Sequence, residues 1–274
     1  MLELPEALTL ARQLRESVVG REIVGVVANA SPHKFAFFTG DPDEYGPTLA
    51  KHRITDAQAF GGLVELTAGD LALVFGDGVN LRLFGPGASL PAKHQLAIRL
   101  DDGSTLVASV QMYGGMSLAP PGELDSPYYR VARSRPSPLS AAFDRAWFDG
   151  LTAEAKPTLS AKALLATEQR IPGLGNGVLQ DILFEARVHP RTKVGTLDAA
   201  ARSRLFDAVK TTLAAMADAG GRDTEKDLFG EPGGYRTVLC AKTAALPCPR
   251  CGGSIVRQAY LGGNVYFCPT CQPV

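Results

Sequence analysis

The stretch Cys248-Pro-Arg-Cys251-Gly-Gly-Ser-Ile-Val-Arg-Gln-Ala-Tyr-Leu-Gly-Gly-Asn-Val-Tyr-Phe-Cys268-Pro-Thr-Cys271 contains two CxxC pairs with sixteen residues between them. Two such pairs can close a tetrahedral cage of thiolates around Zn²⁺. Ser254 to Tyr260 and Asn264 to Phe267 are predicted strands of a hairpin too small to fold without its metal. Because four cysteines leave no open coordination position, we predict one structural zinc ion and no catalytic one.

The remaining cysteine, Cys240, lies outside this pattern and is interpreted as a small buried apolar residue. Thiolates kept for metal are typical of a reducing compartment. We therefore expect a cytoplasmic protein, associated with the nucleoid if the chain is bacterial. A first helix, from about Pro5 to Val19, is predicted to carry several charges and so does not resemble a signal peptide.

Upstream of the ribbon, Ile171-Pro-Gly-Leu-Gly-Asn176-Gly177 lies between two helical patterns, Leu159 to Gln169 and Val178 to Ala186. Its glycines permit a tight turn with open backbone N–H groups, which suits an anion ahead of a helix N-terminus. Asn176 is predicted to cap that helix and to donate to a phosphate. A plain helix-turn-helix corner explains the same spacing equally well.

The first half of the chain has short β-like runs separated by turn signals. Gly76-Asp77-Gly78 and Asp101-Asp102-Gly103 are interpreted as hairpin connections, so residues 20–118 are predicted to form an antiparallel sandwich or barrel. The runs are Ile23 to Val27, Phe35 to Phe38, Gly62 to Leu66, Leu71 to Phe75, Asn80 to Phe84, Gln95 to Leu100 and Ser104 to Val110.

Beyond residue 120 a segment rich in proline and small polar residues is typical of a hinge, and a long helix is expected within Leu197 to Ala219. The fold class is therefore α+β. We predict a β-sandwich at 1–120, a hinge at 121–140, a helical domain at 141–240 and a zinc ribbon at 241–274.

Composition limits the possible functions only weakly. Of the 274 residues 45% are apolar and 20% charged, which is ordinary for a globular protein, and no apolar run is long enough for a membrane helix. The net charge is zero, but residues 1–150 contain 13 basic and 17 acidic residues, against 15 and 11 in residues 151–274. If the chain binds DNA, its phosphates are therefore expected mainly along the second half.

Three features together resemble the formamidopyrimidine-DNA glycosylase and endonuclease VIII family. They are Met1-Leu2-Glu3-Leu4-Pro5-Glu6, the glycine-rich turn around Asn176, and the terminal four-cysteine ribbon. The resemblance spans essentially the whole chain. It implies that the β-sandwich is followed by a helix-two-turn-helix domain and a zinc ribbon, with DNA in the cleft between them.

The family flips a damaged base out of the duplex, because the glycosidic bond cannot be reached inside the stack. An N-terminal secondary amine, the proline after the removed methionine, attacks the sugar C1′ and cleaves the strand through a Schiff base. The resemblance thus implies damaged-DNA recognition and base excision repair by a DNA glycosylase and abasic-site lyase. It also implies a monomer that binds damaged duplex DNA and no membrane.

This sequence departs from the family at the nucleophile, because Leu2 occupies the proline position. Leucine at this position blocks removal of Met1, whose α-amine can still act as a nucleophile near neutral pH. Glu3 and Glu6 are kept as candidates for the general acid that opens the deoxyribose or protonates the base. Equally, two acidic residues around Pro5 suit the first turn of a helix.

Other family positions also differ. A strand lysine that lies near the lesion phosphate aligns with Asp70, and an arginine of the zinc hairpin aligns with Gly263 or Asn264. Neither replacement can hold a phosphate in the same way. The parts of the family's site that hold phosphate are retained at Lys156 and Asn176. The wedge that fills the space left by a flipped base aligns with three other residues. The wedge residues are Leu83, Met112 and Tyr113.

The residue changes leave two hypotheses on one scaffold: a repair enzyme, or a protein that binds damaged DNA without cutting it. A module unrelated to DNA is disfavoured by Lys156, Asn176 and the basic second half. Polar and glycine-rich segments on the β domain are candidates for compensating groups, namely 29–35, 75–80 and 110–115. They and a nearby loop contain His33, Lys34 and His94, of which the histidines are interpreted as surface or hydrogen-bonded residues.

Overall fold

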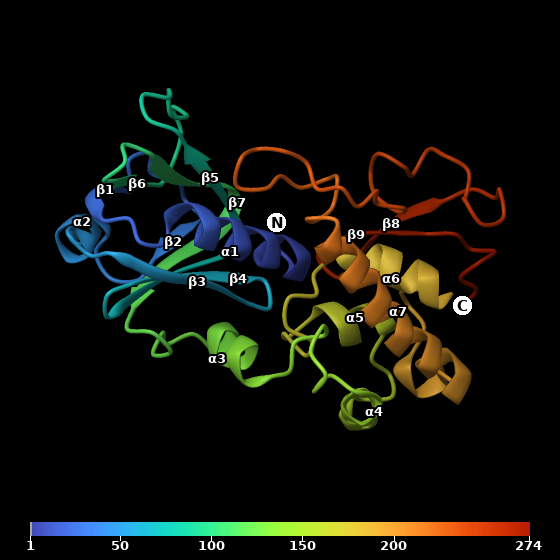
Figure 1. The fold of residues 1–274 in the computed structure, drawn as a ribbon. Coiled ribbons are helices and arrows are strands. Elements are labelled where there is room, and N and C mark those ends of the chain that lie inside the picture. Colours follow the sequence, from blue (N-terminus) through green and yellow to red (C-terminus); the bar gives the residue numbers. More distant parts are fainter. Residues whose placement is uncertain (1) are drawn as a thin grey trace.

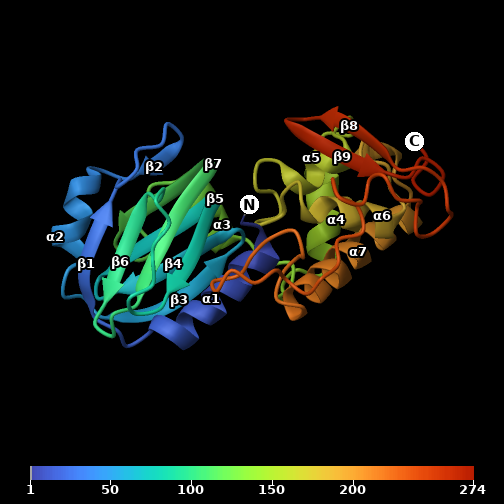
Figure 2. The same cartoon turned by 90° about the horizontal axis from the view of Figure 1, so that it is seen from above.

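The computed structural model describes residues 2–274. Figures 1 and 2 show a β-rich lobe and a helical lobe that meet at the N-terminal end of the described chain. The predicted α+β class is confirmed, with a β-sandwich first, helices next and a four-cysteine hairpin last. Within residues 2–274 no helix is long and apolar enough to cross a membrane.

Helix α1 (Leu4–Val18) connects the two lobes and matches the predicted first helix to within a residue at each end. Pro5 lies in its first turn, where the N–H group that proline lacks would have no partner within the helix. Leu10 and Leu14 pack into the core of the β lobe, whereas Leu4 packs into the core of the helical lobe. Because its leucines are buried in the cores of both lobes, the start of α1 is fixed at the boundary between them.

The β lobe contains seven described strands in the order β1-β6-β7-β5-β4-β3, with β2 parallel to β7 and every other pair antiparallel. Short helices η1 (Pro42–Glu44) and α2 (Tyr45–Leu49) connect β2 to β3. The strands are β1 (Ile23–Ala28), β2 (Ala36–Phe38), β3 (Ile54–Phe60), β4 (Leu63–Ala68), β5 (Leu71–Phe84), β6 (Leu96–Leu100) and β7 (Thr105–Ala119).

One predicted hairpin is wrong. Gly76-Asp77-Gly78 is not a turn between two strands but the middle of β5, which runs on to Phe84 beside β7. The register shifts there, from Asp77 opposite Gly114 to Val79 opposite Val110, so that residues 111–113 bulge out of β7. Asp77 has a left-handed φ of 59°, which bends the strand instead of reversing it. The second predicted turn, at Asp101-Asp102-Gly103, does connect β6 to β7.

The helical lobe follows a segment that, contrary to a plain linker, contains helix α3 (Pro127–Ser134). The turn between α5 and α6 carries the glycines 173, 175 and 177, and α6 matches its predicted bounds. The long helix α7 also forms where it was expected. The remaining elements are α4 (Arg145–Glu154), α5 (Ala161–Ala166), α6 (Val178–Ala186), η2 (Val194–Thr196) and α7 (Ala199–Asp218).

The terminal hairpin consists of β8 (Val256–Tyr260) and β9 (Gly263–Phe267), close to the predicted strands. It packs on the helical lobe, since Phe184 of α6 shares a small core with Tyr266 and Cys268. Figure 2 shows the hairpin lying over α5 and α6 on the side of the turn. The turn, the hairpin tip and the N-terminal segment are thereby brought to one place.

Candidate active site

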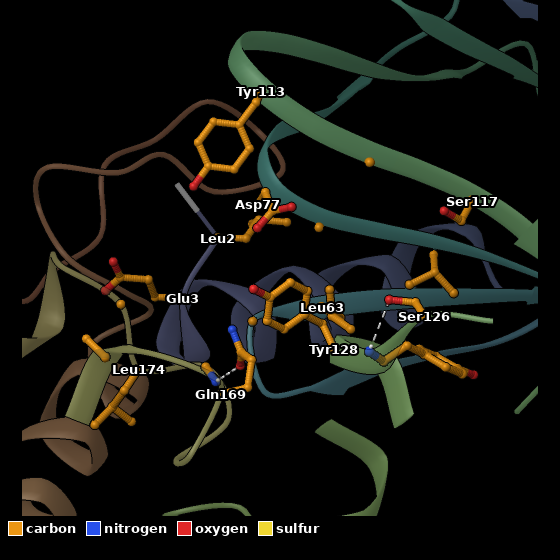
Figure 3. Close-up of a pocket in the computed structure, with 18 of the residues that line it drawn as sticks. Leu2, Glu3, Leu63, Asp77, Tyr113, Ser117, Ser126, Tyr128, Gln169 and Leu174 are labelled. Carbon is orange, nitrogen blue, oxygen red and sulfur yellow. Dashed lines mark hydrogen bonds between the residues drawn. The ribbon is translucent and has the colours of Figure 1, made fainter. Parts of the chain in front are cut away.

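A cavity of about 320 Å³ lies where the two lobes meet. Its wall combines the N-terminal residues Leu2 and Glu3 with strands β5 and β7, helix α3, the turn before α6 and the tip of the terminal hairpin at Gly262. Figure 3 shows Asp77, Tyr113 and Leu2 on one side and Glu3 with Leu174 on the other. The cavity is therefore built from segments that are far apart in the sequence.

Backbone contacts fix the N-terminal segment in the cavity wall. The N–H of Leu2 donates to the carbonyl of Asp77 at 2.7 Å, and the N–H of Leu4 donates to the carbonyl of Gly173 at 2.9 Å. A Cβ on Gly62 would lie 2.9 Å from the carbonyl oxygen of Leu2, so a side chain there would displace the segment. The predicted nucleophile Met1 lies outside the described residues.

Glu3 is buried, with 3% of its surface exposed, and its carboxylate holds the start of α6. It accepts hydrogen bonds from the N–H groups of Gly177 at 2.8 Å and Val178 at 2.7 Å. Burial raises the pKa of Glu3, and the nearby positive charge of Arg222 opposes that shift. The prediction that Asn176 caps this helix is wrong, because the free amides are taken by a carboxylate from the other end of the chain.

Glu6 lies behind the cavity wall and does not line the cavity itself. Both of its oxygens accept hydrogen bonds from Arg222, at 2.9 Å from Nε and 2.8 Å from Nη2. Arg222 is 2% exposed and also lies 3.4 Å from the carboxylate of Glu3. A Cβ on Gly177 would lie 1.6 Å from Arg222, so the turn needs glycine at that position for the arginine to reach both carboxylates.

The second carboxyl group of the cavity belongs to Asp77. As a residue Asp77 is accessible to solvent, but the surrounding walls partly desolvate its carboxyl and raise its pKa above the ordinary value. Tyr113, at the end of the β7 bulge, lines the cavity beside it, and desolvation together with the Asp77 charge raises the pKa of this tyrosine. The described lining residues include no lysine, arginine or histidine.

Asn176 connects the turn to the terminal hairpin. Its Nδ2 donates to the carbonyl of Asn264 at 2.9 Å, and its Oδ1 accepts from Nζ of Lys162 at 2.8 Å. Lys162 is 3% exposed and also donates to the carbonyl of Tyr260 at 2.6 Å, and loss of solvent lowers its pKa. Asn176 lines the cavity, but both ends of its amide already have protein partners.

Other predicted residues lie elsewhere. Of the three proposed wedge positions only Tyr113 lines the cavity, because Met112 is 69% exposed on the bulge and Leu83 packs against the core of the β lobe. Lys156 is exposed in the loop before α5, outside the cavity wall.

The structure does not fit the alignment of the family's strand lysine, which lies near the lesion phosphate, with Asp70. Asp70 lies in the turn between β4 and β5, is 91% exposed in its side chain and pairs with His52 at 3.5 Å. Gly62 and Leu63, at the other end of β4, are the residues of this hairpin that reach the cavity. The two ends of a six-residue strand are about 17 Å apart, so the alignment was displaced along the hairpin.

The polar segment 29–35 lines a separate hollow of about 510 Å³ on the β lobe, which contains His33 and Lys34. His33 accepts a hydrogen bond from the backbone N–H of Phe35, and His94 lies 2.7 Å from the carbonyl of Pro91. Neither histidine reaches the main cavity. Their interpretation as hydrogen-bonded surface residues agrees with these contacts.

The four cysteines of the ribbon fit one zinc ion. Their sulfurs lie within 4.8 Å of one another, with 3.8 Å between Cys248 and Cys271 and 3.5 Å between Cys251 and Cys268. Sulfurs at the corners of a tetrahedron with ~2.3 Å bonds to zinc would be about 3.8 Å apart. The site is closed by four thiolates, so the ion would hold the hairpin rigid, and Cys240 lies outside it.

Comparison with known proteins shows which family has this architecture. Residues 245–274 match the zinc finger found in FPG and IleRS. The formamidopyrimidine-DNA glycosylase of Alkalilimnicola ehrlichii is 32% identical over 285 residues, which cover 99% of this chain and 100% of that protein. The chain belongs to the formamidopyrimidine-DNA glycosylase family. The family enzyme of Thermus thermophilus is likewise 32% identical, over 99% of this chain and 98% of that protein.

Solved members of the formamidopyrimidine-DNA glycosylase family have the same fold. The crystal structure of the Thermus thermophilus protein matches with a TM-score of 0.82 at 27% identity, over 98% of each chain. A Lactococcus lactis family protein, solved in complex with DNA that contains an abasic site, matches with a TM-score of 0.84 at 24% identity, over 99% of this chain and 100% of that one.

Sequence reasoning missed three residues that organise the site. Arg222 follows two glycines in a loop and has no periodic signal, and Lys162 lies within a helical pattern whose lysines are usually solvated. Asp77 belongs to a polar, glycine-rich segment that predicts a turn. Arg222 and Lys162 acquire their partners, and Asp77 its neighbours in the cavity wall, from segments far away in the chain, so only the fold reveals them.

Proposed function

We propose that this protein is a DNA glycosylase with abasic-site lyase activity that recognises damaged duplex DNA in base excision repair. One observation carries the proposal: Leu2 and Glu3 lie in the wall of a cavity that also contains the turn before α6 and the tip of the zinc ribbon. Family membership supports the same function. We further propose that the protein acts as a cytoplasmic monomer, divided into domains at 1–120, 141–240 and 241–274 with a hinge at 121–140.

In this proposal the α-amine of Met1 attacks C1′ of a flipped nucleotide, and Glu3 serves the opening of the deoxyribose. Glu6 acts indirectly, because its carboxylate orients Arg222, which lies against Glu3. Asn176 and Lys156 are assigned to the DNA backbone. Leu83, Met112 and Tyr113 are assigned to the space that the flipped base leaves, with Tyr113 the best placed of the three.

Binding of damaged DNA without cleavage is the second candidate function. It is favoured by the absence of lysine, arginine and histidine among the described lining residues, since phosphate or an oxyanion would find no cation in the cavity wall. The hairpin tip has glycines at positions 262 and 263, which supply no cation either.

Borohydride trapping on oligonucleotides with an abasic site or an oxidised base distinguishes the repair enzyme from a protein that only binds damaged DNA. The repair proposal predicts a covalent protein–DNA adduct, and peptide mapping should place it on Met1. Binding that is at least tenfold tighter to lesion-bearing than to intact duplex, with no adduct and no strand cleavage, would favour the second function. Equal binding to both duplexes without reaction would contradict both.

A further inference from the structure

The two carboxyl groups of the cavity differ in how they are held. Glu3 is 3% exposed, two backbone N–H groups donate to it, and Arg222 lies beside it. Asp77 remains accessible, and no group within residues 2–274 is hydrogen-bonded or ion-paired to its carboxyl. An incoming nucleotide can therefore reach the carboxyl of Asp77, whereas that of Glu3 is already occupied by the protein.

The backbone at Asp77 is unusual for a residue with a side chain. Its φ of 59° is left-handed, a conformation that glycine adopts without strain and that costs other residues on the order of 1 kcal/mol, and less for asparagine and aspartate. Both neighbours are glycines, and a Cβ on Gly78 would lie 2.4 Å from the carbonyl oxygen of Tyr113. A third glycine at position 77 would relieve the strain, yet the chain has a carboxylate there, aimed into the cavity (Figure 3).

The surroundings of Asp77 favour a protonated carboxyl. Among residues 2–274, the ionisable groups that line the cavity with it are Glu3 from the N-terminal segment, Tyr113 from β7, and Tyr128 and Tyr129 from α3. None of these supplies a positive charge, and partial desolvation raises the pKa of Asp77. A carboxyl that holds a proton closer to neutral pH is suited to general acid catalysis.

We propose that Asp77 is a catalytic general acid of this site, which protonates the base as it leaves the sugar. The inference rests on the proposed glycosylase function and adds a second carboxyl to it. The Leu2 N–H bond to the Asp77 carbonyl at 2.7 Å sets this residue one position from the amine that the proposed function assigns to the attack.

The step balances without an outside reagent. The neutral α-amine forms a bond to C1′ while the C1′–N glycosidic bond breaks, and the leaving base nitrogen takes the proton of the Asp77 carboxyl. The new ammonium on C1′ then returns a proton to the Asp77 carboxylate. The products are the free base, a neutral amine adduct and the protonated Asp77 carboxyl. The carboxyl is then ready for another turnover.

The pair Asp77→Asn and Asp77→Gly tests the proposal, because both residues tolerate a left-handed φ and so should fold. Single-turnover base release should fall by about 100-fold or more in each variant, while affinity for a duplex with an uncleavable abasic-site analogue changes less than about threefold. The wild-type rate should decline as pH rises through the Asp77 pKa, and Asp77→Asn should lack this limb. Asp70→Asn, an exposed carboxyl outside the cavity, is the matched control and should behave as wild type.

Asp77→Gly should melt no lower than the wild type, since it removes strain, so a loss of activity in it cannot be attributed to unfolding. Base release by Asp77→Asn within about threefold of wild type, with the same pH profile, would overturn the role of Asp77 and leave the glycosylase function intact. A wild-type protein that binds lesions but releases no base would overturn the proposed function itself, and with it this role.

Discussion

Replacing Arg222 with methionine should destabilise the fold more than any change to a surface charge. The guanidinium is 2% exposed and lies between the carboxylates of Glu3 and Glu6, which are 3% and 5% exposed. Methionine has a similar length and no charge. The variant therefore leaves two buried carboxylates near each other without the cation that offsets their mutual repulsion.

The expected loss in the free energy of unfolding depends on the hydrogen bonds that each carboxylate keeps in Arg222→Met. Breaking a buried pair by removal of one partner costs about 3–5 kcal/mol. Glu3 keeps the amides of Gly177 and Val178, and Glu6 keeps the backbone N–H of residue 222 at 3.1 Å. We therefore expect the lower end of the range, about 3 kcal/mol, which corresponds to a fall in Tm of roughly 6 °C for a chain of this size.

Thermal and urea unfolding at pH 5 and pH 8 would measure the effect. A buried carboxyl without a cation takes up a proton more readily, so the deficit of Arg222→Met should be larger at pH 8 than at pH 5. Adding Glu6→Gln should recover part of the loss. The control Arg12→Met removes an exposed pair with Glu16 and should stay within about 0.5 kcal/mol of wild type. A deficit for Arg222→Met as small as that of the control, or equal at both pH values, would refute the reasoning.

Three further outcomes are expected. Burial raises the pKa of Asp181 from 3.8 to about 6. Its contribution to stability is therefore fully present below about pH 3.8 and is lost as pH rises through about 6. Asp181→Asn should remove that part of the curve of stability against pH, and an unchanged curve would contradict this prediction. Cys268→Ser or chelation should release one zinc per chain in a metal assay and weaken DNA binding at least tenfold, and full affinity in the metal-free protein would count against the ribbon. Asn176→Ala should weaken binding to damaged and intact duplex by a similar factor in a titration, and a loss confined to one lesion would argue against a backbone contact.

Elements with a local cause could be predicted from the sequence. Helices α1, α6 and α7 follow their apolar periodicity, and the ribbon follows the spacing of four cysteines. The hairpin at Gly76-Asp77-Gly78 was wrong because the same residues suit a turn and a bulge, and long-range pairing of β5 with β7 decides between them.

The site was only partly predictable for a related reason. Glu3 was identified, but its partners, Gly177 and Arg222, are more than 170 positions away in the chain. The cap of α6 was assigned to the adjacent Asn176 because a local hydrogen bond is the usual solution at a helix start. A carboxylate brought there by the packing of Leu4 in the helical core replaces it, and no local pattern signals that replacement.

The residue at position 2 connects the departure from the family to the proposed role of Asp77. Leu2 is 9% exposed and packs into the core of the β lobe, and its N–H donates to the Asp77 carbonyl at 2.7 Å. In the family the proline at this position is an N-terminal secondary amine that serves as the nucleophile, whereas the nitrogen of Leu2 is an amide that donates to a carbonyl. Leu2 therefore anchors the segment beside Asp77, where a family enzyme has its nucleophile. Because Leu2 and Asp77 form one hydrogen-bonded pair, the replacement of the family's proline at position 2 directly changes the surroundings of the proposed acid at position 77.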